Sequence, residues 1–341
     1  MRILSREDVR AALPMADAIE CMKQAFAALA RGDATLPTRT QLAAPDGAGV
    51  TLVMPARVDG ASRSLAVKIV SVFDQNPAAG HARVQAAVIV LEPATGRPLA
   101  LVEGAALTAI RTAAASGAAT DLLAPPGSTV LAVLGAGVQA RSHIEAMCAV
   151  RPISTIRIYA PTPANVDALI DEMRVEGGIG AALARAESAA GAVRGADIIC
   201  ATTTSATPVF DDADAKSGAH INAVGSYMPG AREVSGATVA RSWLAVDERD
   251  AAWTEAGDLI LARDEGLIDA DHVRAELGEL LLDPDLRPAD PEQPTLFKSV
   301  GIAVQDAFSA ATVVEEATRC GLGTVVNLQG EADSPRRPAR S

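Results

Sequence analysis

The segment 129–143 constrains the fold of this chain more than any other stretch of its sequence. A run of β-branched and aliphatic residues leads into Gly135-Ala136-Gly137-Val138-Gln139-Ala140, and a helical stretch follows. Strand, glycine turn and helix in this order are typical of a dinucleotide-binding turn. Gly135 permits the tight turn, Gly137 lets the phosphates approach the backbone, and Ala140 keeps the helix close to the sheet. Because a helix N-terminus attracts negative charge, the motif predicts a dinucleotide site.

Strands and helices alternate beyond Pro125-Pro126-Gly127, which is the best candidate for a domain boundary. The strands expected there are nearly continuous apolar runs at 130–134, 155–159, 197–202, 220–225 and 243–246. This alternation predicts a parallel doubly wound sheet. The segment 38–102 instead contains strand-like runs separated by turn clusters, which predicts a mostly antiparallel α+β region.

Composition and charge limit the classes of partner. A chain of 341 residues favours two domains, and a formal net charge of −12 argues against nucleic acid and anionic membranes as partners. The four cysteines show no CxxC spacing, which is typical of small buried hydrophobes in a reducing compartment. The four histidines lack metal-ligand spacing, so we expect no metal. The start has no apolar leader and no run is long enough to span a membrane, which favours a cytoplasmic protein.

Three cations, Arg39, Lys68 and Arg111, are candidates for binding a carboxylate. Lys68 lies inside an apolar run where a solvated charge would be unusual, and Arg111 lies in a helix of Ala, Thr and Leu. Arg39 stands at the start of the strand region. If the three converge, they would hold an α-carboxylate by charge-assisted, partly bidentate bonds. From the residues alone, separate surface cations or structural ion pairs explain them equally well.

Six runs occur along the chain in the order found in a known family: 36–39, 67–70, 107–116, 135–140, 221–226 and 295–301. Together they resemble the ornithine cyclodeaminase/mu-crystallin family across nearly the whole chain. The resemblance implies an α/β fold with a Rossmann-type doubly wound parallel sheet inserted in an α+β domain. It implies that 1–120 with 304–330 bind substrate and form a homodimer, and that 121–303 bind NAD(P). We expect 331–341 to be a disordered tail.

The resemblance also implies roles for individual residues. Arg39, Lys68 and Arg111 match positions that hold the substrate carboxylate, with Lys68 and Arg111 as the catalytic pair. Cofactor contacts are expected from the glycine turn 135–140, and beyond it from Arg111, Thr112, Thr162, Asn165, Thr202, Val224, Gly225, Ser226 and Gly301.

The chain departs from the family pattern at Tyr227, two residues before Pro229. Ornithine cyclodeaminases carry an aspartate there, which serves deamination and cyclisation. A carboxylate can take a proton from an amine or water near neutral pH, whereas a phenol is ordinarily a hydrogen-bond donor. Tyr227 therefore favours the reductive branch of the family and a substrate-contacting role; the alternative is an aromatic side chain that only packs in its loop.

Cofactor preference depends on the residues that come after the second Rossmann strand. An NAD site usually offers an acidic residue about 20 positions past the glycine turn to bind the ribose 2′-hydroxyl. This chain has Ala160-Pro161-Thr162 there, so no carboxylate repels a 2′-phosphate and NADPH is favoured. Thr162 and Asn165 match family positions that contact the cofactor. No arginine stands at the strand end, so the preference is modest and NADH is also acceptable.

The expected activity is the NAD(P)H-dependent reduction of a small cyclic α-imino acid. Δ1-pyrroline-2-carboxylate and Δ1-piperideine-2-carboxylate, which give L-proline and L-pipecolate, are the expected substrates. Hydride transfer needs an iminium, whose proton Lys68 or an ordered water could supply. The alternatives are an ornithine cyclodeaminase, an alanine-dehydrogenase-like enzyme, or a non-catalytic mu-crystallin-like binding protein. The three intact cations argue against a purely structural role.

Overall fold

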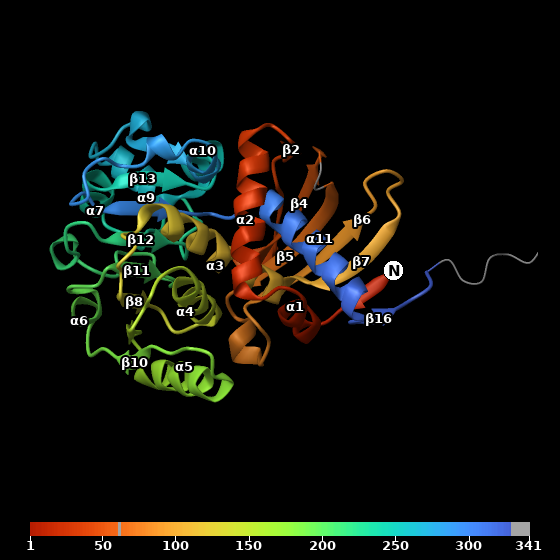
Figure 1. The fold of residues 1–341 in the computed structure, drawn as a ribbon, viewed down its shortest axis with the longest axis horizontal. Helices are drawn as coiled ribbons and strands as arrows, with labels where there is room; N and C mark the ends of the chain where they lie inside the picture. Colours follow the sequence, from red (N-terminus) through yellow and green to blue (C-terminus); the bar gives the residue numbers. More distant parts are fainter. Residues whose placement is uncertain (61–62, 329–341) are drawn as a thin grey trace, which may run out of the picture. The chain divides into compact units, whose positions relative to one another are not determined.

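The computed structural model describes residues 1–60 and 63–328, and the chain divides into two compact units (Figure 1). Unit 1 comprises Met1–Leu13, Leu36–Leu107 and Asp306–Ser341. Unit 2 comprises Pro14–Thr35 and Thr108–Gln305. The chain passes from one unit to the other after Leu13, after Thr35, and within two helices, α3 (Gly104–Leu123) and α11 (Ala303–Cys320). The tail expected at 331–341 lies outside the described residues.

Unit 1 is built on a mostly antiparallel sheet ordered β16-β1-β7-β6-β5-β4, with β3 also paired to β4. Its strands are β1 (Arg2–Leu4), β3 (Thr40–Ala43), β4 (Gly49–Val58), β5 (Ser64–Phe73), β6 (Val84–Leu91), β7 (Pro98–Glu103) and β16 (Thr324–Val325). The antiparallel pairing of β4 to β7 confirms the prediction from the strand-like runs. One neighbour differs, because β1 pairs with β7 in parallel.

The two faces of this sheet differ in burial because side chains alternate along each strand. One face is buried, and α11 runs along it, where Asp306 contacts Lys68 of β5 (Figure 1). The opposite face is apolar and partly open to solvent. The register aligns five of its side chains in one row across the sheet: Ile3, Leu101, Ile89, Val67 and Pro55.

In unit 1, β1 is followed by the short helix α1 (Arg6–Ala12), which starts with a capping box. Ser5 Oγ accepts a hydrogen bond from the Asp8 backbone N–H, and the Asp8 carboxylate accepts one from the Ser5 N–H. These two bonds satisfy backbone donors that the first helical turn cannot pair internally.

Unit 2 is built on a parallel sheet ordered β10-β9-β8-β11-β12-β15-β13-β14. Its strands are β8 (Val130–Leu134), β9 (Thr155–Tyr159), β10 (Ala182–Arg185), β11 (Ile198–Ala201), β12 (His220–Ala223), β13 (Trp243–Val246), β14 (Val273–Glu276) and β15 (Thr295–Lys298). The central strands β11, β12, β13 and β15 are buried throughout, as expected where helices cover both faces. This confirms the predicted doubly wound sheet.

The order in which successive strands are added to this sheet reverses at β8. The chain runs outward through β9 and β10, and then returns to the other side of β8 at β11. In doubly wound sheets, ligands bind outside the carboxyl ends of the strands at such a switch point. The glycine turn follows β8, so the topology places it at this switch.

Helices cover the parallel sheet on both of its faces. They are α4 (Val138–Val150), α5 (Pro163–Glu176), α6 (Ala189–Val193), α7 (Gly236–Arg241), α8 (Arg249–Glu255), α9 (Gly257–Asp264) and α10 (Leu277–Leu282). The N-terminal helix α2 (Met15–Ala30) belongs to unit 2, where it packs against α4 and α10. The short strand β2 (Ala34–Thr35) follows it. None of the described helices is both long and apolar enough to cross a membrane.

Candidate active site

The glycine turn between β8 and α4 has the geometry that its sequence predicts. Gly135 has a φ of +112°, which favours glycine, and a Cβ atom there would lie 2.8 Å from the Thr202 carbonyl oxygen. Apart from its chain neighbours, no heavy atom of the described residues lies within 4 Å of the position that a Cβ at Gly137 would take, so the backbone there is open to approach. Ala140 is fully buried in the first turn of α4. The turn therefore fits a pyrophosphate approaching the helix N-terminus.

Several other predicted cofactor residues lie at the same edge of the parallel sheet. Thr202 follows β11 directly, and its hydroxyl donates to the Leu134 carbonyl oxygen at the end of β8, at 3.0 Å. Strand β12 is followed directly by Val224, Gly225 and Ser226. Gly301 lies three residues after the end of β15. The carboxyl ends of parallel strands share one edge, so the topology groups these residues with the glycine turn.

The residues predicted to select the cofactor lie at the end of β9, which neighbours β8 in the sheet. Thr162 and Asn165 are exposed at the start of α5, where Thr162 is the N-cap residue without a side-chain cap hydrogen bond. The Asn165 backbone N–H donates to the Thr162 carbonyl oxygen at 3.1 Å. Ala160, where an acidic residue would bind a ribose 2′-hydroxyl, is half-buried beside the turn.

Arg111 of α3 is buried in unit 2, with Thr112 buried next to it. Its Nη1 donates to Gln305 Oε1 at 3.1 Å, and Gln305 Oε1 also accepts from the Ile302 backbone N–H at 2.9 Å. Gly301 has a φ of +81°, and a Cβ atom there would lie 2.8 Å from Arg111 Nη1. Gly301 therefore leaves room for the guanidinium at the carboxyl edge of β15.

Lys68 of β5 is the other buried cation, and it lies in unit 1. Its Nζ is 2.6 Å from Asp306 Oδ2, and both side chains are only 2% exposed. Lys68 shares one face of β5 with Ala66 and Val70, because side chains alternate along a strand, and all three are buried. A buried charge without a partner would be very unfavourable, so the ion pair is what allows an ammonium here.

Sequence reasoning missed both partners of these cations, Gln305 and Asp306. They are consecutive residues in the first turn of α11. An acidic residue in that position has a sufficient explanation in the helix dipole, so it gave no sign of a functional contact. The signal that could have found them is that the surrounding run, Ala303-Val304-Gln305-Asp306-Ala307-Phe308, is otherwise apolar.

Arg39 and Tyr227 are both half-buried, and they lie in different units. Arg39 directly precedes β3 in unit 1. Tyr227 lies in the loop after β12 in unit 2, next to the buried Ser226. The Ser226 carbonyl oxygen accepts a hydrogen bond from Lys298 Nζ at 2.6 Å, so this loop is held from within the sheet.

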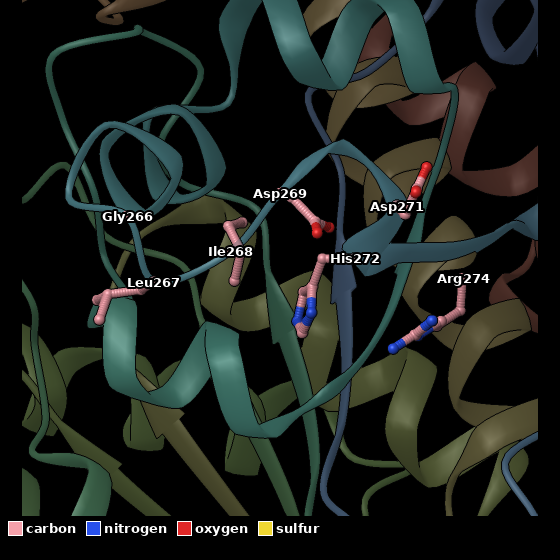
Figure 2. A pocket seen from close by; sticks show the side chains of 7 residues that line it. All are labelled: Gly266, Leu267, Ile268, Asp269, Asp271, His272 and Arg274. Carbon is pink, nitrogen blue, oxygen red and sulfur yellow. The ribbon is translucent and has the colours of Figure 1, made fainter.

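A separate hollow of about 390 Å³ lies elsewhere in unit 2. Figure 2 shows its lining, which is Gly266, Leu267, Ile268, Asp269, Asp271, His272 and Arg274. These residues precede or begin β14, so they lie at the amino end of the parallel strands, away from the glycine turn. His272 Nε2 donates to the Val239 carbonyl oxygen at 2.8 Å. In the described residues, no group of three His, Cys, Asp or Glu could hold a metal ion.

The chain is similar to several known proteins. The model of the ornithine cyclodeaminase/mu-crystallin family matches residues 1–321. A Delta(1)-pyrroline-2-carboxylate reductase of Bacillus cereus is 35% identical over 329 residues, which are 96% of this chain and 100% of that protein. The ketimine reductase mu-crystallin of Mus musculus is 37% identical over 284 residues, 83% and 86% of the two chains.

A solved structure is similar over the same length. It is that of Thermococcus litoralis Delta(1)-pyrroline-2-carboxylate reductase in complex with NADH and L-proline. Its TM-score is 0.92 at 39% sequence identity, and the match covers 96% of this chain and 100% of that one. The likeness therefore includes both sheets.

Proposed function

The chain belongs to the ornithine cyclodeaminase/mu-crystallin family, and we propose that it is an NAD(P)H-dependent reductase of a small cyclic α-imino acid. Δ1-pyrroline-2-carboxylate and Δ1-piperideine-2-carboxylate are the proposed substrates, with L-proline and L-pipecolate as products. The names of the Bacillus cereus and Mus musculus relatives support reduction of a C=N bond. Segments 1–120 and 304–330 would bind substrate, and 121–303 would bind the cofactor.

The buried ammonium of Lys68 is the observation that carries this proposal. Imine reduction requires a protonated C=N bond, and a cation is needed near an anionic substrate. Asp306 Oδ2 lies 2.6 Å from Lys68 Nζ, and this ion pair offsets the cost of burying an ammonium. Lys68 can therefore contact the substrate carboxylate or maintain the proton on the imine nitrogen.

Arg111 would bind the substrate carboxylate through its guanidinium, and Arg39 would add a second cation. Gln305 and Gly301 fix Arg111 before any substrate arrives, so orientation requires little reorganisation on binding. The partners of Arg111 and Lys68, Gln305 and Asp306, are consecutive in the chain.

The bound dinucleotide would supply the hydride. The residues at the carboxyl edge of the parallel sheet fit such a group, since Gly135 and Gly137 leave the turn open before the N-terminus of α4. Thr162 and Asn165 would contact the adenosine ribose, and the absence of an acidic residue at Ala160 supports a preference for NADPH over NADH. Thr202, Val224, Gly225 and Ser226 would contact the nicotinamide half.

Tyr227 supports reduction over cyclodeamination, because a phenol is a poor base for releasing ammonia from ornithine. The open apolar face of unit 1 supports a homodimer, since a contiguous apolar surface of this kind marks an interaction site. The four cysteines are unbridged, which supports the reducing environment of the cytoplasm.

The direct test is oxidation of NADPH and NADH by the purified protein with each of the two cyclic imines. Pyruvate with ammonia and ornithine with NAD⁺ test the alanine-dehydrogenase and cyclodeaminase alternatives. We expect rapid cofactor oxidation with a cyclic imine and little ammonia from ornithine. Efficient conversion of ornithine to proline would contradict the proposal, and cofactor binding without turnover would favour a binding protein.

Substitution of Arg111 tests the assignment of the site. Arg111→Ala should remove a charge-assisted contact with the substrate carboxylate, worth roughly 1.5–3 kcal/mol, and lower kcat/KM by about 10- to 100-fold. The control is Arg241→Ala, which removes a guanidinium that Asp212 holds near the amino end of β13. The control should keep its kcat/KM. Equal kinetics of a folded Arg111→Ala and the wild type would remove Arg111 from the site.

A further inference from the structure

A second cluster of buried charges lies behind the carboxyl edge of the parallel sheet. Glu233 is fully buried, and its two carboxylate oxygens accept hydrogen bonds from different loops. The Thr203 N–H, after β11, donates to Oε1 at 2.5 Å. The Gly225 N–H, after β12, donates to Oε2 at 2.5 Å. One side chain thus ties together the loops that extend from two neighbouring strands.

Two further buried charges hold Glu233 in place. Asp258 Oδ1 accepts hydrogen bonds from the backbone N–H groups of Glu233 and Val234, at 2.7 and 2.9 Å. Asp258 Oδ2 is 2.7 Å from Lys298 Nζ, and both of these side chains are 0% exposed. Lys298 Nζ also donates to the Ser226 carbonyl oxygen. The Asp258–Lys298 pair therefore contacts the loop after β12, which Glu233 also holds through Gly225.

These segments approach each other so closely that a glycine is required at position 225. A Cβ atom at Gly225 would lie 2.6 Å from both carboxylate oxygens of Glu233, and closer still to the Thr203 carbonyl oxygen. Any other residue would separate the two loops or displace the carboxylate. The backbone from Gly225 to Tyr227 is thus set by buried charges and has little freedom of its own.

We propose that Glu233, supported by the Lys298–Asp258 pair, is a positioning residue that holds the 202–203 and 225–227 loops in the conformation that receives the nicotinamide end of the cofactor. The identity of that ligand rests on the proposed function, whereas the fixing of the loops does not. Glu233 itself touches neither cofactor nor substrate. Its effect is therefore on hydride geometry rather than on capture of the carboxylate.

The hydrogen-bond pattern requires an ionised Glu233. Both of its oxygens face backbone N–H donors, so a proton on either oxygen would oppose one of these bonds. Burial raises the pKa of the Glu233 carboxyl, and the nearby Lys298 ammonium opposes that shift. Lys298 thus has two roles, since it pairs with Asp258 and favours the charged form of Glu233.

Glu233→Gln is the sharpest test, because the amide keeps the size of the side chain but has a single acceptor oxygen. One backbone N–H must then face an NH₂ group. Hydrogen exchange followed by mass spectrometry on the free protein should show exchange at Thr203 and Gly225 faster by roughly 10- to 100-fold. Exchange in strands β8, β11 and β12 themselves should stay at the wild-type rate.

Kinetics and cofactor binding provide the second measurement. In Glu233→Gln, kcat for imine reduction should fall by roughly 10-fold or more, with the KM of the imino acid within about 3-fold of wild type. NADPH binding, followed by its fluorescence, should weaken. If Glu233→Gln does not fold, the double variant Asp258→Asn/Lys298→Gln neutralises both partners together and is judged by the same exchange and kinetics.

Asp197→Asn is a matched control at the opposite edge of the same sheet. Asp197 precedes β11, accepts hydrogen bonds from the Thr129 and Val130 N–H groups at 2.7 and 2.8 Å, and pairs with Lys216. Its loss should speed exchange at Thr129 and Val130 and leave kcat and NADPH binding unchanged.

The outcomes separate this inference from the proposed function. A wild type that reduces no imine contradicts the proposed function, and the exchange result still decides whether Glu233 fixes the loops. An active wild type with an indistinguishable Glu233→Gln overturns the inference. Equal effects of Glu233→Gln and Asp197→Asn on exchange throughout the sheet and on kcat also overturn it, because both carboxylates would then be merely structural.

Discussion

At the scale of single residues, burial and hydrogen-bond partners determine the charge state of His143. His143 of α4 is fully buried, and its Nδ1 donates to the Gln139 carbonyl oxygen at 2.8 Å, because a carbonyl can only accept. Its Nε2 lies 3.0 Å from the Ser116 Oγ, and burial disfavours a second proton on the ring. The ring is therefore neutral. Burial lowers the pKa of His143 to about 4.

This neutral histidine predicts a loss of stability in acid. The unfolded chain binds a proton at His143 below about pH 6.5, whereas the folded protein resists it until about pH 4, so unfolding is favoured as the pH falls. From about pH 7 to about pH 5 this removes about 2 kcal/mol from the free energy of unfolding.

Urea unfolding of the wild type and of His143→Gln at several pH values measures this contribution. The variant should be less stable at neutral pH but show a weaker pH dependence, by about 2 kcal/mol over that range. His81→Gln, at an exposed position, is the control and should keep the wild-type dependence. Parallel pH profiles of His143→Gln and the wild type would show that His143 does not carry the effect.

The role of a residue could be predicted from the sequence only where its residue type is unusual in its surroundings. Lys68 inside an apolar strand was unusual enough to be singled out, and its burial is confirmed. Asp306, Glu233 and Asp258 were missed, because acidic residues at helix starts and in loops are ordinary. Their roles depend on which groups the fold packs against them, and that is a non-local property.

At the scale of elements, the carboxyl end of β9 is the most informative. Its exposed Thr162 and Asn165 lie beside the glycine turn, and Ala160 replaces the usual acidic residue. Strands with a strong apolar pattern, such as β8 and β13, were predicted. The edge strands β10 and β14 were not, because an edge strand is less buried and carries a weaker apolar pattern. Strand β15 lay in a run noted only for its family resemblance.

Ala160→Asp should reverse the proposed cofactor preference. The new carboxylate would repel a 2′-phosphate and could accept hydrogen bonds from a ribose 2′-hydroxyl. We expect kcat/KM to be higher with NADPH in the wild type and higher with NADH in the variant. Ala160→Asn has a similar shape without the charge and should change the ratio less. A wild-type kcat/KM that is higher with NADH would contradict the assignment.

At the scale of the whole molecule, the open face of unit 1 is the feature that a single chain leaves unexplained. Ile69 on this face is 41% exposed, and Ile3 and Leu42 are also exposed. Side-chain alternation along its strands gives this sheet two faces. Which face α11 covers could not be predicted from periodicity, because the last helix returns to a unit that begins some 300 residues earlier in the chain.

We expect Ile69→Arg to convert a dimer into a monomer. A charge placed in an apolar interface without a partner is strongly unfavourable. Light scattering on a size-exclusion column gives the mass directly. Val175→Arg is the control, since Val175 is a solitary apolar residue on α5 that is 87% exposed, and it should remain dimeric. A monomeric wild type, or a dimeric Ile69→Arg, would contradict the proposed interface.

Because Gln305 and Asp306 are adjacent, insertions between them are constrained during evolution. Each residue added to an α-helix rotates the remainder of that helix by about 100°. A single codon inserted between these two positions would leave Gln305 beside Arg111 and rotate Asp306 away from Lys68. Surface loops of this protein can gain or lose residues over evolution without such a penalty. The start of α11 should therefore keep a constant length in descendants that retain both contacts, even where the surrounding sequence diverges.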